Sequence, residues 1–178
     1  MTMRKPLLTL MLAACCALSH VHAADLPPLA HTLTMQAPKP APALKLKDIE
    51  GKSHDLAKLR GKVVLINFWA TWCPPCRREM PSMERLSQRF KGQPFVVLAV
   101  DVGEDPDTIE TFASQLDTTL TFPILLDTRS HAMRAWRVAG LPTTFLIDKQ
   151  GRIVATAIGG REFDHPEMVK AVGELVRK

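Results

Sequence analysis

The chain has 178 residues, of which 46% are hydrophobic and 23% are charged, a balance that suits one globular domain with a short appendage and a core that needs no disulfide stapling. Without residues 1–23, which hold two basic residues and no acidic one, 21 Lys and Arg face 18 Asp and Glu. So small a net charge, with no clustered basic stripe, argues against nucleic-acid binding.

The first 23 residues have the layout of a secretory signal. Arg4 and Lys5 precede an apolar stretch over residues 7–18, and "VHA" at residues 21–23 fits a cleavage site. The stretch is short for a bilayer span, so we expect cleavage after Ala23 and a periplasmic protein. The alternative is a lipoprotein signal at "LAAC", in which Cys15 carries a lipid and tethers the protein to the membrane.

Residues 24–43 predict a Pro-rich tether. Five prolines fall in this segment, and little in it could build a core. The alternative is an extended segment laid on the domain surface, because Leu29, Leu33 and Met35 are apolar. The globular domain is predicted over residues 44–178.

The front half of that domain alternates strands with helices. "LKLKDI" followed by a turn at residues 50–52 predicts a small hairpin. "KVVLINFWA" predicts a strand buried on both faces, after which a helix should begin at the prolines behind Cys73 and run to about Phe90. "PFVVLAVDV" predicts a second buried strand, and Asp105 with Pro106 should start the next helix.

The back half closes the fold. "FPILLD" predicts a third strand, followed by a short helix through Met133 and Trp136. "TTFLID" and "IVATAIGG" flank a turn and predict an antiparallel hairpin. Asp164 and Glu167 are spaced as a capping-box analogue before an amphipathic C-terminal helix. The whole order predicts an α/β fold with a mixed central sheet flanked by helices.

Cys73 and Cys76 are separated only by two prolines. A thiol attacks as the thiolate, which is favoured at a helix N-terminus, and Cys73 occupies the predicted N-cap. Cys73 is therefore the expected nucleophile. Cys76, one turn further, should be close enough to form the disulfide and more covered, as suits the resolving thiol. Because Pro74 and Pro75 carry no N–H, Cys76 supplies the first backbone donor inside the helix.

Metal binding and a purely structural disulfide suit this pair less well. A zinc or copper site needs two further ligands, and the chain has no second C-x-x-C pair, while His54, His131 and His165 stand alone in the sequence. A disulfide that closes so short a loop restricts the unfolded chain very little. We therefore expect redox chemistry at the two thiols, with neither a metal nor another cofactor.

"NFWATWCPPC" and "GLPTTFLID" resemble motifs of the thioredoxin superfamily, and residues 44–178 resemble its exported TlpA/ResA-like thiol:disulfide reductase branch. The resemblance implies a thioredoxin-like fold with an N-terminal β-hairpin and a central helix–strand insert. It also implies that Pro142 is a cis-proline facing the cysteines and receives a substrate strand with the backbone of Leu141. The alternative is a trans proline that opens an inner strand.

The resemblance bears on three further positions. Asn67 stands where thioredoxin has a buried aspartate, and a neutral amide cannot take a proton from the resolving thiol. In the similar reductases a glutamate tunes the cysteines from the position of Glu79; the alternative is a solvated Glu79 that pairs with Arg78. Trp69 is expected in the core, and Trp72 is expected to be exposed as a substrate contact.

Together these features predict an exported thiol:disulfide oxidoreductase that reduces disulfides of envelope proteins. The resemblance implies a membrane thiol transporter of the DsbD or CcdA kind as electron donor, and apocytochrome c or copper-site assembly proteins as clients. Two alternatives stay open. The same fold could serve as an oxidase or isomerase, because direction depends on the reduction potential, or the thiols could be ligands of a copper-binding assembly chaperone.

Overall fold

The computed structural model describes residues 27–178, and its sheet is built on the two long apolar runs of the sequence. The first forms β4 (Val63–Trp69), in which all seven residues are buried, and the second forms β5 (Phe95–Val102), which pairs with it in parallel. Both strands match the predictions. The expected signal segment, residues 1–23 with Cys15, lies outside the described residues.

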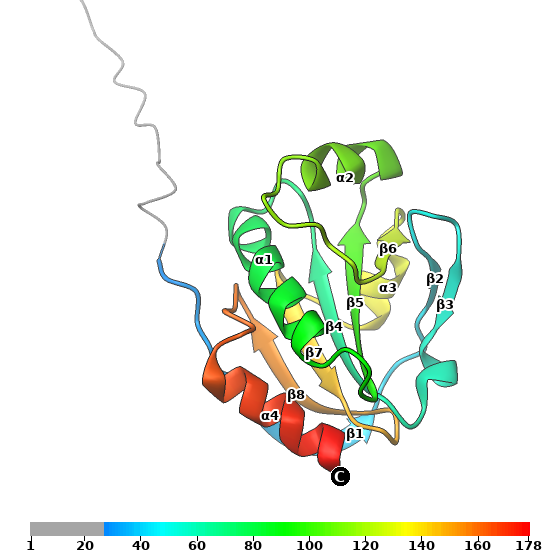
Figure 1. Ribbon diagram of the computed structural model, residues 1–178. Helices are drawn as coiled ribbons and strands as arrows, with labels where there is room; N and C mark the ends of the chain where they lie inside the picture. The colour runs from blue at the N-terminus through cyan, green and yellow to red at the C-terminus, as the bar shows by residue number, and fades with distance from the viewer. Residues whose placement is uncertain (1–26) are drawn as a thin grey trace, which may run out of the picture.

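Six strands make up the sheet, in the order β1-β8-β7-β4-β5-β6 (Figure 1). The parallel half consists of β4, β5 and β6 (Ile124–Asp127), and the antiparallel half adds β7 (Thr143–Ile147), β8 (Arg152–Ile158) and β1 (Thr34–Pro40). This mixed sheet confirms the predicted fold class, and the parallel strand β6 is the strand of the predicted central insert.

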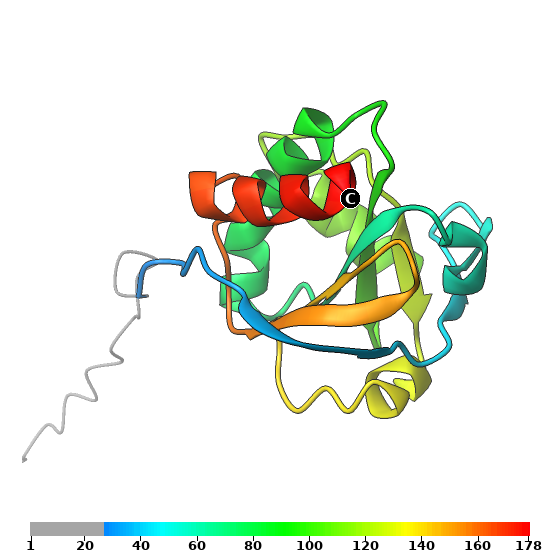
Figure 2. The ribbon, with the colours of Figure 1, turned by 90° about the horizontal axis from the view of Figure 1, so that it is seen from below.

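Helices cover both faces of the sheet. In Figure 2, α1 (Pro74–Arg89) and α4 (Pro166–Arg177) lie on one face and α3 (His131–Ala135) lies on the other, while α2 (Pro106–Ala113) follows β5. Alternate side chains of β4 enter two cores, Val63 and Leu65 on the α1 face, and Val64 and Ile66 on the α3 face. Within residues 27–178, no helix combines the length and apolar character that crossing a membrane requires.

The predicted N-terminal hairpin is present as a separate two-stranded sheet. It pairs β2 (Lys45–Lys47) with β3 (Ser53–Asp55) in antiparallel register. The Asp48 carboxylate closes the turn by accepting hydrogen bonds from the backbone N–H groups of Glu50, at 3.1 Å, and Lys52, at 2.9 Å. Gly51 takes the positive φ of 82° that the turn requires.

The structure corrects part of the predicted tether over residues 24–43, because residues 34–40 form the edge strand β1, in agreement with the alternative of an extended segment laid on the domain. Pairing with β8 shifts register between Met35 and Lys39, and Pro38 lies inside this irregular stretch. Prolines are tolerated at bulges and on edge strands, so they did not prevent pairing. The sheet therefore begins at Thr34, ten residues before the predicted start of the domain.

The start of α4 also differs from the predicted capping box. The N-cap is His165, whose Nδ1 accepts a hydrogen bond from the Glu167 N–H at 3.4 Å. Asp164 is instead held by Arg85, whose Nε lies 2.5 Å from its carboxylate, and Arg85 also pairs with Glu162 at 3.1 Å. This ion-pair cluster connects α1 to the segment before α4. Because Asp164 is engaged in it, the N-cap of α4 is the next residue, His165.

Candidate active site

The two cysteines sit where β4 passes into α1, near the carboxyl ends of the parallel strands. Cys73 is the N-cap of α1, and Pro74 and Pro75 are its first residues. The cysteines form a disulfide with their Cα atoms 5.3 Å apart. Cys73 is 3% exposed and Cys76 is fully buried, so both residues of the pair lie below the surface and Cys76 is the more covered. The short spacing at a helix start thus produces the redox-competent pair that the sequence predicted.

The start of β7 lies beside this helix entrance. The Leu141–Pro142 peptide bond is cis, and the next residue, Thr143, pairs with Phe68 near the end of β4. Pro142 is buried, and its carbonyl accepts a hydrogen bond from the Gly159 N–H at 2.8 Å. The sequence alternative of a trans proline is therefore wrong, and the cis residue lies level with the strand end that leads to Cys73.

Glu79 lies on α1 one turn after Cys76 and is fully buried. Its Oε1 accepts a hydrogen bond from Asn67 Nδ2 at 2.8 Å, and its Oε2 accepts one from the Arg161 N–H at 2.9 Å. The alternative of a solvated Glu79 paired with Arg78 is wrong, because Arg78 points to the Pro27 carbonyl instead. The Glu79 carboxyl group therefore lies in the protein interior, one helical turn after Cys76.

The environment of Glu79 favours its protonated form. Burial raises the pKa of Glu79 to about 8, and the hydrogen bonds donated by Arg161 N–H and Asn67 counter this rise only in part. The side chain can therefore exchange a proton close to neutral pH. Asn67 also donates to Thr144 Oγ1 at 3.1 Å, so a neutral amide joins the acid on α1 to strand β7.

The two tryptophans of the motif separate as predicted. Trp69 is fully buried in the core and packs at 5.4 Å, between ring centroids, against Phe112 of α2. Trp72 is 68% exposed directly before Cys73. An exposed indole beside a reactive sulfur offers apolar area and an N–H donor to an incoming chain, although its contact with substrate stays a prediction.

The sequence did not identify Glu104, in the corner between β5 and α2, as part of the site. One oxygen of its carboxylate accepts a hydrogen bond from the Thr71 N–H and the other accepts one from the Thr71 hydroxyl, both at 2.6 Å. Thr71 lies two residues before Cys73, so Glu104 fixes the backbone that delivers the first cysteine. Charge-assisted bonds of this length are among the stronger hydrogen bonds in proteins.

Asp101, near the end of β5, supports the hydrogen-bonded contact between Glu104 and Thr71. It is buried, and its Oδ1 accepts a hydrogen bond from the Glu104 N–H at 3.2 Å, whereas Oδ2 has no partner among the described residues. Burial and the neighbouring Glu104 carboxylate raise the pKa of Asp101 to about 8. An acidic residue inside the apolar run "PFVVLAVDV" was the one signal of this arrangement in the sequence.

Comparison with known proteins agrees with this geometry. The model of the AhpC/TSA family matches residues 37–156. The chain belongs to the AhpC/TSA family. The thiol-disulfide oxidoreductase ResA of Geobacillus thermodenitrificans is 48% identical to this chain over 113 residues, and that of Bacillus cereus is 41% identical over 125 residues. These matches confirm the ResA-like resemblance that the cysteine and proline motifs indicated.

The extent of these matches is partial. The Geobacillus match covers 64% of this chain and 64% of the relative, and the Bacillus cereus match covers 70% and 71%. Among solved structures, a thiol:disulfide interchange protein of the thioredoxin family from Chlorobium tepidum superimposes with a TM-score of 0.67 at 28% identity, covering 79% of this chain and 98% of that one. StoA from Bacillus subtilis gives 0.62 at 27% identity, covering 74% and 99%. The thioredoxin-like fold is therefore confirmed.

Proposed function

We propose that the protein is a thiol:disulfide oxidoreductase that reduces disulfides in other proteins through Cys73 and Cys76. The observation that carries this proposal is the Cys73–Cys76 disulfide at the start of α1. ResA relatives that carry the name thiol-disulfide oxidoreductase support it.

The reaction begins with the reduced enzyme. The Cys73 thiolate, favoured by the helix N-terminus, attacks one sulfur of a substrate disulfide and releases the other sulfur as a thiolate that takes up a proton. Cys76 then loses its proton and attacks Cys73, which releases the second substrate sulfur. The substrate gains two electrons and two protons, and the enzyme ends as the Cys73–Cys76 disulfide.

Glu79 is the proposed acceptor of the Cys76 proton. It lies one helical turn from Cys76, and its pKa of about 8 matches a group that must take and return a proton near neutral pH. Leu141, which is half-buried, would offer its main-chain groups to an extended substrate peptide beside Pro142, and Trp72 would contact the side chains of that peptide.

The location, donor and clients belong to the same proposal. Export follows from the signal layout of residues 1–23, with release after Ala23 or lipid attachment at Cys15 as the two routes. A reductase in an oxidising compartment needs electrons from elsewhere, which a membrane thiol transporter of the DsbD or CcdA kind would supply. Disulfide-containing envelope proteins, such as apocytochrome c or copper-site assembly proteins, would be the clients.

Trapping tests the proposed roles of the cysteines. Cys76→Ser keeps the attacking thiol but removes the one that resolves the mixed disulfide, so it should accumulate disulfide-linked complexes that dissolve in reductant. Cys73→Ser is the matched control and should form far fewer of them. If Cys76→Ser traps no envelope protein, or if both variants trap equally, the assignment fails.

The direction of electron flow has its own measurement. Reduction potentials of this fold extend from about −270 mV in thioredoxin to about −120 mV in the oxidant DsbA. A reductase should lie near the lower end when equilibrated with glutathione or dithiothreitol buffers. A value near the DsbA end would contradict the reductive direction and leave the oxidase alternative.

A further inference from the structure

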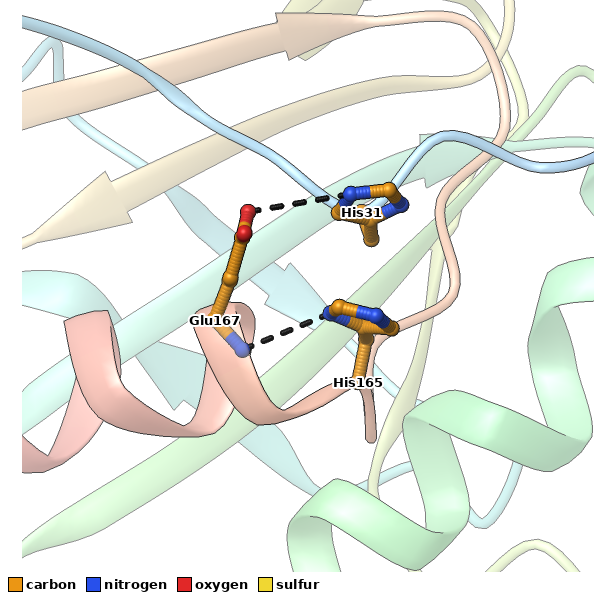
Figure 3. Close-up of side chains that lie close together, drawn as sticks. All are labelled: His31, His165 and Glu167. Atoms are coloured by element: carbon orange, nitrogen blue, oxygen red, sulfur yellow. Dashed lines mark hydrogen bonds and ion pairs between the residues drawn. The ribbon is translucent and has the colours of Figure 1, made fainter.

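Three side chains able to bind a metal meet where the N-terminal segment passes the start of α4. His31, His165 and Glu167 each offer one ligand atom, and these atoms all lie within 4.8 Å of one another. Figure 3 shows one ring nitrogen of each histidine on the side of Glu167. His31 Nε2 is 3.7 Å from Glu167 Oε2, and the two imidazole rings stack with centroids 4.0 Å apart.

The backbone, rather than the cluster itself, brings His31 to this position. On one side of His31, the Ala30 N–H donates to the Gly160 carbonyl at 3.2 Å, and the Glu162 N–H donates to the Ala30 carbonyl at 2.6 Å. On the other side, Arg161 Nε donates to the Thr32 carbonyl at 2.8 Å. Two segments far apart in the chain are thus held together independently of their histidines.

The remaining adjustment is small and falls on side chains. Ligand atoms about 2.0–2.2 Å from a metal lie roughly 3–3.5 Å from one another, so the present cluster has to close by only about 1–2 Å. The side chains of His31 and Glu167 are 46% and 60% exposed, so rotation of these two meets little resistance. Because the fold already holds the three residues close together, little further conformational entropy is lost when they bind a metal.

The orientation of His165 also suits a metal. Its Nδ1 faces the Glu167 N–H and accepts a hydrogen bond from it at 3.4 Å, so the same lone pair would bind the metal once that bond is released. At 3.4 Å this bond is long, and releasing it costs little. Two imidazoles with one carboxylate favour late first-row divalent ions over Mg²⁺ and Ca²⁺, which prefer oxygen ligands.

We propose that His31, His165 and Glu167 form a binding site for a divalent late transition-metal ion, with Cu²⁺ bound more tightly than Zn²⁺. The bound ion would join the N-terminal segment to the first turn of α4. The site includes neither Cys73 nor Cys76, so the test of metal binding is independent of the test of reductase activity. In the sequence His165 stands alone, because only the fold brings it to His31.

The test is a calorimetric titration of the untagged full chain with Cu²⁺ and Zn²⁺. The protein is kept oxidised, so that the Cys73–Cys76 disulfide withholds these two thiols from the metal, and the other two cysteines, Cys15 and Cys16, are alkylated before the titration. We expect one ion per chain. Loss of an outer-sphere partner of a metal ligand weakens metal binding by about 10- to 100-fold, and His31→Ala and His165→Ala, which each remove a ligand itself, should weaken it at least as much. Glu167→Gln should weaken binding less. Electron paramagnetic resonance of the Cu²⁺ complex should report two nitrogen ligands, and one in His31→Ala.

Two controls separate this site from other histidines. His131→Ala removes an exposed histidine elsewhere on the surface and should leave the affinity unchanged. A double variant, His20→Ala with His22→Ala, removes the two that precede the described residues and should also bind normally. The proposal is overturned if no saturable binding occurs below about 1 mM, if His31→Ala retains full affinity with two nitrogen ligands, or if the double variant abolishes binding. Far-ultraviolet circular dichroism confirms that each variant is folded.

Discussion

Replacing Glu79 with Gln removes a buried titratable group while keeping the size of the side chain. Burial raises the pKa of Glu79 from 4.5 to about 8. At about 1.4 kcal/mol for each pH unit, placing the ionised carboxylate in this interior costs about 5 kcal/mol relative to the unfolded chain. The replacement has a smaller cost, because the Gln amide nitrogen must face one of two donors, Asn67 Nδ2 or the Arg161 N–H, and loses a hydrogen bond of about 1 kcal/mol.

These opposing costs give the stability a definite pH dependence. Between pH 4.5 and about 8 the folded protein keeps a proton on Glu79 that the unfolded chain has released, so the free energy of unfolding falls as the pH rises. Glu79→Gln lacks this dependence. It should be about 1 kcal/mol less stable than the wild type at pH 4.5 and about 4 kcal/mol more stable above pH 8. Urea unfolding of both oxidised proteins across this range measures the difference.

The same variant tests the proton transfer. If Glu79 accepts the Cys76 proton, the rate at which the mixed disulfide is resolved should rise with pH through an inflection near 8 in the wild type. Glu79→Gln should lose that inflection and be slower by about 10²- to 10⁴-fold, the usual contribution of general base catalysis. Stopped-flow tryptophan fluorescence with a disulfide peptide gives the rates.

A second buried acid on the same helix provides the control. Glu84 is 4% exposed, and its carboxylate accepts hydrogen bonds from the Thr121 N–H at 2.8 Å and from Gln88 Nε2 at 2.6 Å. Glu84→Gln should reduce stability but leave the pH profile of disulfide exchange unchanged. If Glu79→Gln also has the wild-type profile, Glu79 takes no part in proton transfer.

Three further predictions concern the loop, the exposed indole and the edge strand. Glu104→Gln should lower the free energy of unfolding by about 2–3 kcal/mol, because the two 2.6 Å hydrogen bonds from Thr71 would no longer be made to a charged carboxylate. The same variant should alter the rate at which iodoacetamide alkylates reduced Cys73, and an unaltered rate would exclude a positioning role for Glu104. Trp72→Ala should change the free energy of unfolding by less than about 0.5 kcal/mol, since Trp72 is 68% exposed. It should raise KM for a protein substrate but not for a small disulfide, and equal effects on both substrates would contradict a substrate contact of Trp72. A chain that starts at residue 41 should be about 2–4 kcal/mol less stable to urea than one that starts at residue 34, because only the first lacks β1, whereas equal stability would mean that β1 behaves as a tether.

The parts of the fold that could be predicted from sequence are those whose information is local. Strand β4 is buried on both faces, so its apolar run alone identifies it, and Asp105 and Pro106 begin α2 as predicted because an N-cap and its first helical residue are neighbours. Strand β1 carries no such pattern, since most of its side chains are exposed and only pairing with β8 defines it. Its prolines favoured a tether because the sequence does not show which strand lies at an edge.

The site divides in the same way. Cys73 and Cys76 lie within one helical turn, so their disulfide could be predicted from spacing and helix geometry. The cis bond before Pro142 was expected only from the resemblance, and the burial of Glu79 could not be decided from its helix position. Glu104 was missed because its partner Thr71 is 33 residues away, a contact that no local pattern reveals.

The bond between Thr71 and Glu104 limits how far this active site can be transplanted. Grafting "WCPPC" onto another thioredoxin-like scaffold would carry both cysteines but not the corner between β5 and α2 that restrains the segment before them. The donor and recipient would then share a motif without sharing the backbone position of its first sulfur. A successful graft should include Asp101 and Glu104 as well, so the smallest portable unit of this site is two loops rather than one.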